Sequence, residues 1–207
     1  MMRSFLVLMA AWASASPALA QLPQTRLYTL SPPGVAPGQI NDVRINTGAD
    51  LDQVDRLVFN HPGIFATVKQ QPDGNGGFRA VPNTFRVAVE ADVPPGRYEV
   101  RAIGLFGTSN PRMLIVDPRP AVGETEPNNA AAQAQTIEVG ALVDGVINGA
   151  GDLDVVKFAA RQGERIIVDC LAERIDSKLN PMLTLMNADA RPVAFARNEY
   201  GRDAFLV

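Results

Sequence analysis

Apolar and polar residues alternate in short runs along most of the chain, and Pro, Gly, Asn and Asp gather between these runs. Alternation with a period of two is typical of half-buried strands, and such clusters are typical of turns. In the clearest run, Tyr98, Val100 and Ala102 share one side of the strand and charged residues occupy the other. The pattern predicts strands in the first half of the chain at residues 43–45, 56–59, 85–89, 98–102 and 113–116.

The second half continues in the same way and contains no amphipathic segment of helix length. Strands are expected there at residues 137–139, 142–147, 154–158, 166–171, 182–186 and 192–196, with a hairpin turn at 187–191. The chain is therefore predicted to be all-β. The glycine-rich run 73–77 is expected to be a hairpin loop. Pro94-Pro95-Gly96 marks a corner, after which Tyr98 is expected to place its ring in the core and its hydroxyl on backbone, as in a tyrosine corner.

A change in sequence composition near residue 118 predicts a domain boundary. Asp117-Pro118-Arg119-Pro120 is a stiff connector, because each proline fixes its own backbone and restricts the residue before it. We therefore expect two β-sandwich modules, at residues 21–117 and 124–207, joined by a proline-rich linker at 118–123.

The N-terminal segment has the pattern of a cleaved secretory signal. Arg3 precedes an apolar run at residues 5–12, and Ala18-Leu19-Ala20 supplies the small residues of a cleavage site. Residues 1–20 are therefore predicted to be a signal peptide and the mature chain to be extracellular or periplasmic. The run is short for a membrane span, and no later stretch reaches 18 apolar residues, so no membrane span is expected after cleavage. The alternative is that the segment is not cleaved and remains as an anchor.

Composition and charge disfavour two function classes. The 207 residues include 19 Lys and Arg against 22 Asp and Glu, which leaves no basic field for a nucleic acid. A Ser-His-Asp triad would need His61 together with Ser31, Ser109 or Ser177, and none of these serines lies in a nucleophile-elbow pattern. Cys170 lies on the apolar side of a predicted strand, where we expect a core residue and not a nucleophile. The chain is therefore predicted not to be an enzyme.

A set of landmarks in the second half carries a resemblance to a known family. In order, they are Glu124-x-Glu126-Pro127-Asn128-Asn129, Gly145-x-Ile147, Gly151-Asp152-x-Asp154-x-x-x-Phe158, Gly163-Glu164 and Asn180-Pro181-x-Leu183-x-Leu185. Residues 124–207 thereby resemble the bacterial pre-peptidase C-terminal domain, which implies a secreted, jelly-roll-like β-sandwich. The first half, with Pro95-Gly96-x-Tyr98 and Ser109-Asn110-Pro111-Arg112, resembles the immunoglobulin-like module that precedes this domain in large secreted planctomycete proteins.

The chain departs from the family pattern after residues 198–203. The family continues from such an acidic segment into further strands, whereas this sequence ends at Val207. The second sandwich is therefore expected to be incomplete. Either the natural unit is longer or another chain supplies a strand to the open edge, and we favour a shortened reading frame.

Oxygen-bearing side chains gather at the start of the second module. In extended backbone, Glu124, Glu126 and Asn128 share one side, and so do the two aspartates at 152 and 154. Oxygen ligands without His or Cys favour a hard cation. The resemblance implies a calcium site with the ligands Glu124, Glu126, Asn128, Asp152 and Asp154, and with Asn129 and Asp203 as further candidates. The alternative is that these residues only form turns, and an EF-hand is excluded because the run lacks the third ligand and the glycine.

These expectations combine into a predicted function. The chain is expected to be a secreted, non-catalytic binding protein whose interdomain hinge holds calcium, with an extracellular protein or polysaccharide as its partner. The alternative is that it forms the accessory, non-catalytic portion of a secreted peptidase or hydrolase. The sequence leaves the ligand and the oligomeric state open.

Overall fold

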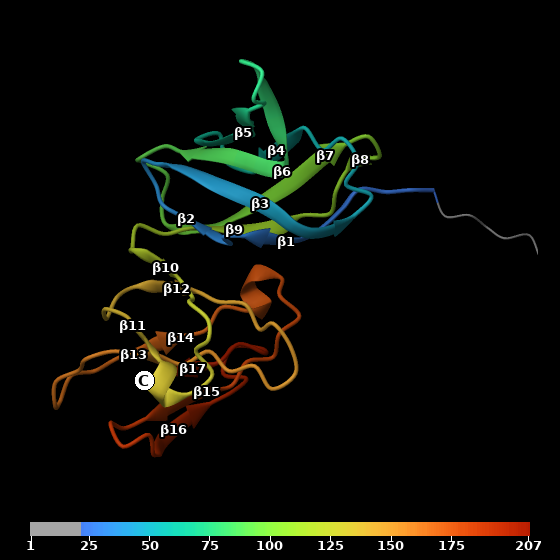
Figure 1. The fold of residues 1–207 in the computed structure, drawn as a ribbon. Helices are drawn as coiled ribbons and strands as arrows, with labels where there is room; N and C mark the ends of the chain where they lie inside the picture. The colour runs from blue at the N-terminus through green and yellow to red at the C-terminus, as the bar shows by residue number, and fades with distance from the viewer. Residues whose placement is uncertain (1–21) are drawn as a thin grey trace, which may run out of the picture.

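The computed structural model describes residues 22–207, which form β-strands and turns with two short 3-10 helices (Figure 1). The expected all-β fold is confirmed. The predicted signal peptide lies outside the described residues. Within residues 22–207, none of the helices has both the length and the apolar character needed to cross a membrane.

Residues 26–116 form two sheets that face each other. The first is antiparallel, with the order β1 (Arg26–Ser31), β3 (Ile40–Ala49), β6 (Phe78–Val89) and β5 (Ile64–Pro72). The second has the order β2 (Gly34–Val35), β9 (Arg112–Val116), β7 (Gly96–Gly104) and β4 (Arg56–Phe59), and β8 (Gly107–Thr108) pairs with β7. All pairs of this second sheet are antiparallel except β2 with β9, which is parallel.

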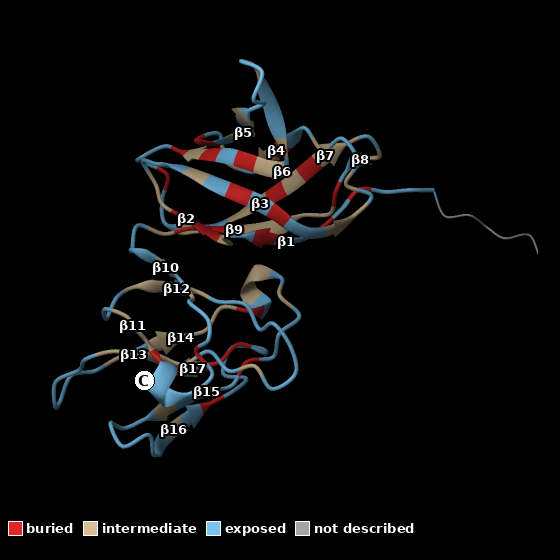
Figure 2. Ribbon diagram, in the orientation of Figure 1, coloured by how far each residue is buried: buried red, intermediate tan, exposed pale blue. Residues whose placement is uncertain are grey.

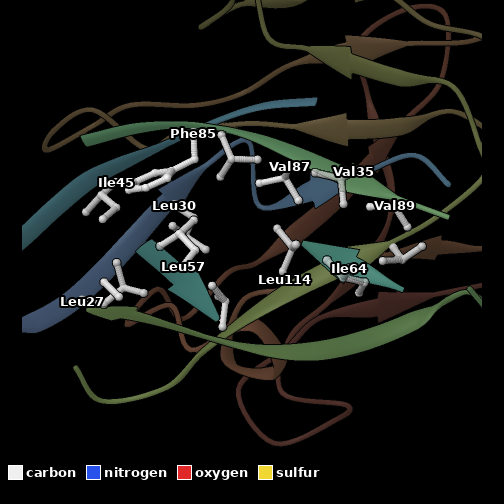
Figure 3. Close-up of a cluster of buried hydrophobic side chains, with 14 of the residues drawn as sticks. Leu27, Leu30, Val35, Ile45, Leu57, Ile64, Phe85, Val87, Val89 and Leu114 are labelled. Atoms are coloured by element: carbon white, nitrogen blue, oxygen red, sulfur yellow. The ribbon is translucent and has the colours of Figure 1, made fainter. Parts of the chain in front are cut away.

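A continuous apolar core fills the space between these two sheets (Figure 3). Phe85, Leu27 and Leu114 are its largest fully buried side chains, and each is at most 1% exposed. In the last part of β6, every second residue contributes to it (Phe85, Val87 and Val89), because alternate side chains of a strand point to opposite faces. Burial of this apolar surface is the main force that holds the two sheets together.

The five strands predicted in the first half are all present, and most are longer than expected. The tyrosine corner is also confirmed, because the Tyr98 hydroxyl donates to the Pro94 carbonyl at 2.7 Å and the ring packs against the core. The loop at 73–77 joins β5 to β6, as expected for a hairpin. Strands β1 and β5 were not predicted.

The second unit contains four strand pairs, each of two strands. The parallel pairs are β10 (Ala121–Gly123) with β12 (Leu142–Asp144) and β11 (Gln135–Thr136) with β13 (Val156–Lys157). The antiparallel pairs are β14 (Val168–Asp169) with β17 (Phe205–Leu206) and β15 (Leu183–Met186) with β16 (Pro192–Ala196). The short helices are η1 (Ala131–Gln133) and η2 (Glu173–Ile175).

Buried residues are much sparser in the second unit than in the first (Figure 2). Its hydrophobic cluster has only Ala196, Ala204 and Leu206 as buried members, with Cys170 packed against them as expected. The strands predicted in this half are mostly shortened to two to four paired residues, and residues 137–139 form none. A small core gives long strands little to pack against, which accounts for the short pairing.

The two units touch through η2 and β9. The Met113 backbone N–H donates to Asp176 Oδ2 at 3.0 Å, and Arg97 Nη1 donates to the Arg174 carbonyl at 3.3 Å. Between the units, Arg119 forms a salt bridge of 2.6 Å with Asp117 across the connector. The first and second units therefore meet through polar contacts in addition to the covalent linker.

Candidate metal centre

Glu124 follows the last residue of β10, and its position is set by the parallel pairing with β12. The Glu124 backbone N–H donates to the Asp144 carbonyl at 2.9 Å, which continues the ladder by one step. The side chain then turns back, and Glu124 Oε1 accepts from the Val146 backbone N–H at 2.8 Å. These two bonds on either side of Gly145 hold the carboxylate against the turn that follows β12.

Asn128 links the segment of Glu126 to the segment of Asp154. Its side chain is fully buried, and its backbone carbonyl accepts from the Val155 backbone N–H at 3.1 Å. The amide orientation that satisfies its donors has Nδ2 donating to Glu126 Oε2 and to the Leu153 carbonyl, both at 3.1 Å. Glu126 Oε2 also accepts from the Asn128 backbone N–H at 3.0 Å. A buried amide satisfied in this way keeps the two segments in register.

Three carboxylates meet where these segments converge. One oxygen each from Glu124, Glu126 and Asp154 lies within 4.8 Å of the other two. Glu124 Oε2 is buried and has no hydrogen-bond partner, so this carboxylate oxygen receives no hydrogen bond. A Cβ on Gly145 would lie 3.1 Å from both Glu124 Oε2 and Asp154 Oδ2. The missing side chain at Gly145 therefore leaves the two carboxylates room to approach the turn.

The electrostatics of this cluster are unfavourable for three free carboxylates. Burial raises the pKa of Glu124, and the negative charges of Asp154 and Glu126 raise it further. Burial also raises the pKa of Asp154, and the neighbouring carboxylates of Asp152 and Glu126 add to this effect, although hydrogen bonds from its partners oppose it. None of the salt bridges among residues 22–207 involves the three clustered carboxylates. A proton or a cation would offset their mutual repulsion.

The structure brings four of the sequence-predicted ligands together and directs the others elsewhere. Asp152 Oδ2 accepts from the Asn148 backbone N–H, within its own turn. Asn129 Oδ1 accepts from the Leu153 backbone N–H at 2.7 Å. Asp203 lies fully buried and accepts from the turn at η2. The convergent set therefore consists of Glu124, Glu126 and Asp154, with Asn128 beside them.

Sequence reasoning overlooked Gly145 as part of the site. It was only a landmark of the family pattern, yet its bare backbone lies directly beside two of the carboxylates. The feature that could have identified it is a glycine between Asp144 and Val146, within the strand predicted at 142–147. A glycine at such a place marks a close approach of other groups to the backbone.

The other groups considered for chemistry have structural roles. His61 Nδ1 accepts from the Gly63 backbone N–H at 3.1 Å, and its ring packs edge-on against Tyr98. Ser109 is buried, and its hydroxyl accepts from the Ala102 N–H and donates to the Asn110 carbonyl. Burial raises the pKa of the Cys170 thiol, and the charges of nearby aspartates raise it further, which favours the unreactive protonated form.

Comparison with known proteins gives no family for this chain. No protein-family model matches the chain, and no curated protein matches it. Among solved structures, the chain is similar to a Bacteroides ovatus protein, SGBP-B of the mixed-linkage glucan utilization locus, in complex with a mixed-linkage heptasaccharide. The TM-score is 0.31 and the identity 13%, and the alignment covers 91% of this chain and 36% of that chain. The chain thus spans about a third of the length of that protein, and the likeness is too distant to indicate a function.

Proposed function

We propose that the chain is a secreted, non-catalytic binding protein of two β-sandwich units, with a calcium ion at the start of the second unit. The second unit is proposed to be a pre-peptidase C-terminal domain, in line with the landmarks in its sequence. The partner is proposed to be an extracellular protein or polysaccharide. The calcium part rests on the convergence of Glu124, Glu126 and Asp154, and on the buried Glu124 Oε2, which has no hydrogen-bond partner.

The oxygen atoms of this cluster suit a calcium ion as ligands. Calcium takes six to eight oxygen ligands from carboxylates, amides, backbone carbonyls and water. Glu124, Glu126 and Asp154 would hold the ion, and the amide of Asn128 would keep their two segments at the right separation. Bound there, the ion would supply the positive charge that three adjacent carboxylates lack.

The place of this cluster connects it to the junction between the units. Glu124 comes directly after the connector and β10, and Gly145 comes directly after β12. At the other end of β12, Leu142 packs against β2 of the first unit, where its side chain lies 3.0 Å from the position of a Cβ on Gly34. An ion bound by Glu124 would therefore lie at the end of the β10–β12 pair, which touches the first unit at its other end.

A binding role fits the uses that the structure gives to the reactive side chains. His61, Ser109 and Cys170 all support turns or the core, as described above. The proposal for function therefore depends on surfaces and not on a catalytic centre. No basic field suited to nucleic acid is expected from a chain of net charge −3.

The calcium site is tested by thermal unfolding of the mature chain from Gln21 to Val207, in calcium and in chelator. With a dissociation constant of about 1 mM, as in extracellular modules, 10 mM calcium should stabilise the folded protein by about 1.4 kcal/mol. For a unit of this size that is a rise of roughly 5 to 10 °C in the unfolding midpoint. Glu124→Gln and Asp154→Asn should abolish the rise.

Asp152→Asn is the matched control. Asp152 lies two residues from Asp154, but its carboxylate accepts from a backbone N–H of its own turn, and an asparagine oxygen can replace that acceptor. The control should keep the calcium response. An equal midpoint in calcium and in chelator for the unaltered chain would refute the site and leave the carboxylates as turn residues.

A further inference from the structure

The outer face of the sheet β1-β3-β6-β5 carries two adjacent rows of side chains, one apolar and one charged. In the first row, Ile40 of β3 lies opposite Ala88 of β6, which lies opposite Phe65 of β5. The next row on the same face, about 7 Å further along the strands, is Asp42, Arg86 and Thr67. We name these six residues the outer strip. Alternating buried and exposed segments on β3 and β6 are visible in Figure 2.

The two large side chains of the apolar row are exposed at one end of the sheet. Ile40, the first residue of β3, is 59% exposed, and Phe65, the second residue of the edge strand β5, is 52% exposed. Ala88 is the small residue between them, and together they border a shallow hollow of about 370 Å³. Neighbouring exposed apolar side chains around a hollow mark a binding surface more often than scattered ones do.

The charged row borders a second hollow of about 390 Å³, which Ile40 shares with the first. Lys69 also borders it and forms a salt bridge of 2.7 Å with Asp42, so these two charges offset each other. Arg86 has no salt bridge among residues 22–207, and the same holds for Arg44, which lies two residues beyond Asp42 on the same face of β3. The second hollow therefore has one bordering guanidinium without a salt bridge, that of Arg86, and Arg44 lies one row further along β3.

One carboxylate lies on the far side of the apolar row. Glu90 borders the first hollow, beyond Phe65 and Ala88, and is exposed. The unpaired charges are thus two guanidiniums at one end of the outer strip and one carboxylate at the other, with the apolar row between them. The chain as a whole is negatively charged, so this end of the sheet differs in sign from the average surface.

We propose that the outer strip is a binding site for an acidic polysaccharide, one that carries a carboxylate on its sugar rings. A sugar ring presents a C–H face that packs on Phe65 and Ile40, and the planar forks of Arg86 and Arg44 match a carboxylate in two parallel hydrogen bonds. The proposal rests on the binding function proposed above and names the ligand class and the surface.

Other occupants fit this surface less well. A stable protein interface buries about 800 Å² on each partner around a central apolar cluster. A single row of Ile40, Ala88 and Phe65 is small for such a cluster but matches the width of one polymer strand lying across the sheet.

The test is calorimetric titration of the mature chain with polygalacturonate, with a neutral unbranched glucan as the comparison polymer. Polygalacturonate should bind and the neutral glucan should bind at least tenfold more weakly. Arg86→Gln and Phe65→Ala should each weaken polygalacturonate binding by about tenfold, because one removes the charge and the other the apolar platform. Added salt should weaken the binding of the unaltered chain more than that of Arg86→Gln.

Matched controls lie on β6, the strand that contains Arg86. Phe78 is 73% exposed at the start of β6, and Arg79 beside it pairs with Gln71 across the hairpin. Phe78→Ala and Arg79→Gln should leave polygalacturonate binding unchanged within twofold. All four substitutions are at exposed positions, so the folded state should be retained.

Three results would overturn the proposal. One is no binding of polygalacturonate at about 10 mM uronate units, which is weaker than any useful affinity. Another is equal loss of binding in the control variants. The third is equally tight binding of polyglutamate with the same dependence on Arg86, because the surface would then recognise charge on any polymer. The calcium response of the same preparation separates this outcome from failure of the proposed metal site, which lies in the other unit.

Discussion

Replacing Asp203 with alanine removes an acceptor on which four donors converge. Asp203 is fully buried, and its carboxylate accepts from the backbone N–H groups of Ala172, Glu173 and Arg174. It also accepts from Arg174 Nε at 2.6 Å. These donors form the turn that begins η2, and this turn is the part of the second unit that touches β9.

The magnitude follows from the number of donors. The substitution leaves three backbone N–H groups and one guanidinium N–H without their acceptor, and each loss costs about 1 kcal/mol where water can enter. The sum, about 4 kcal/mol, lies within the range of 3 to 5 kcal/mol for a broken buried ion pair. Arg174 also forms a salt bridge with Asp169, so its charge is not left alone and the upper end of the range is not expected.

The assay is urea unfolding of the mature chain, followed by far-UV circular dichroism and by hydrogen exchange read in peptides. We expect the exchange protection of the second unit to fall by about 4 kcal/mol, while that of the β6 and β7 peptides, which belong to the large core, stays constant. A loss below about 1 kcal/mol in the second unit would refute the importance of the buried carboxylate.

The pH dependence gives an independent check. Burial raises the pKa of Asp203, but the hydrogen bonds from Arg174 and from the three backbone N–H groups outweigh it and hold the pKa below its usual value. A carboxylate whose pKa is lowered on folding stabilises the protein at neutral pH. This stabilisation begins to decline as the pH falls below the unfolded value and is lost through the folded pKa. The difference in stability between the unaltered chain and Asp203→Ala should therefore shrink on acidification.

Three further substitutions have defined outcomes. Phe85→Ala should lower the free energy of unfolding of the first unit by about 3 to 5 kcal/mol in urea melts, because the ring is 1% exposed in the centre of the core. Gly145→Ala should abolish the calcium-dependent rise of the unfolding midpoint, since its Cβ would lie 3.1 Å from two of the clustered carboxylate oxygens; an unchanged calcium response would show that the ion does not bind there. Tyr98→Phe should cost about 1 kcal/mol in the same melts through loss of the bond to the Pro94 carbonyl, and a neutral effect would contradict a stabilising corner.

Local sequence patterns predicted much of the structure of the first unit. Alternation identified β7 from Tyr98, Val100 and Ala102, and all three face the core. The Pro94-Pro95-Gly96 corner also predicted the bond from the Tyr98 hydroxyl. Strand β5 was not predicted because Lys69, Gln70 and Gln71 interrupt its apolar pattern, and its place in the sheet comes from pairing with β6.

The second unit was harder to predict because its strands are held by distant partners. Strand β17 contains only Phe205 and Leu206, and its partners in the register, Asp169 and Val168, lie 36 and 38 positions earlier in the chain. A two-residue strand has no periodicity to detect. Residues 137–139 have strand-forming composition but gain no strand partner, so propensity alone did not decide their structure.

The sequence by itself determined the all-β class, the apolar faces of the main strands and the types of side chain available for a cation, because alternation and composition are local properties. Only the tertiary structure decided that Glu124 and Asp154 converge while Asp152 and Asp203 accept bonds from other backbone groups. It likewise placed Ile40, Ala88 and Phe65 in one row. The physical reason is that strand register joins residues far apart in the chain, and register depends on how whole faces are buried together.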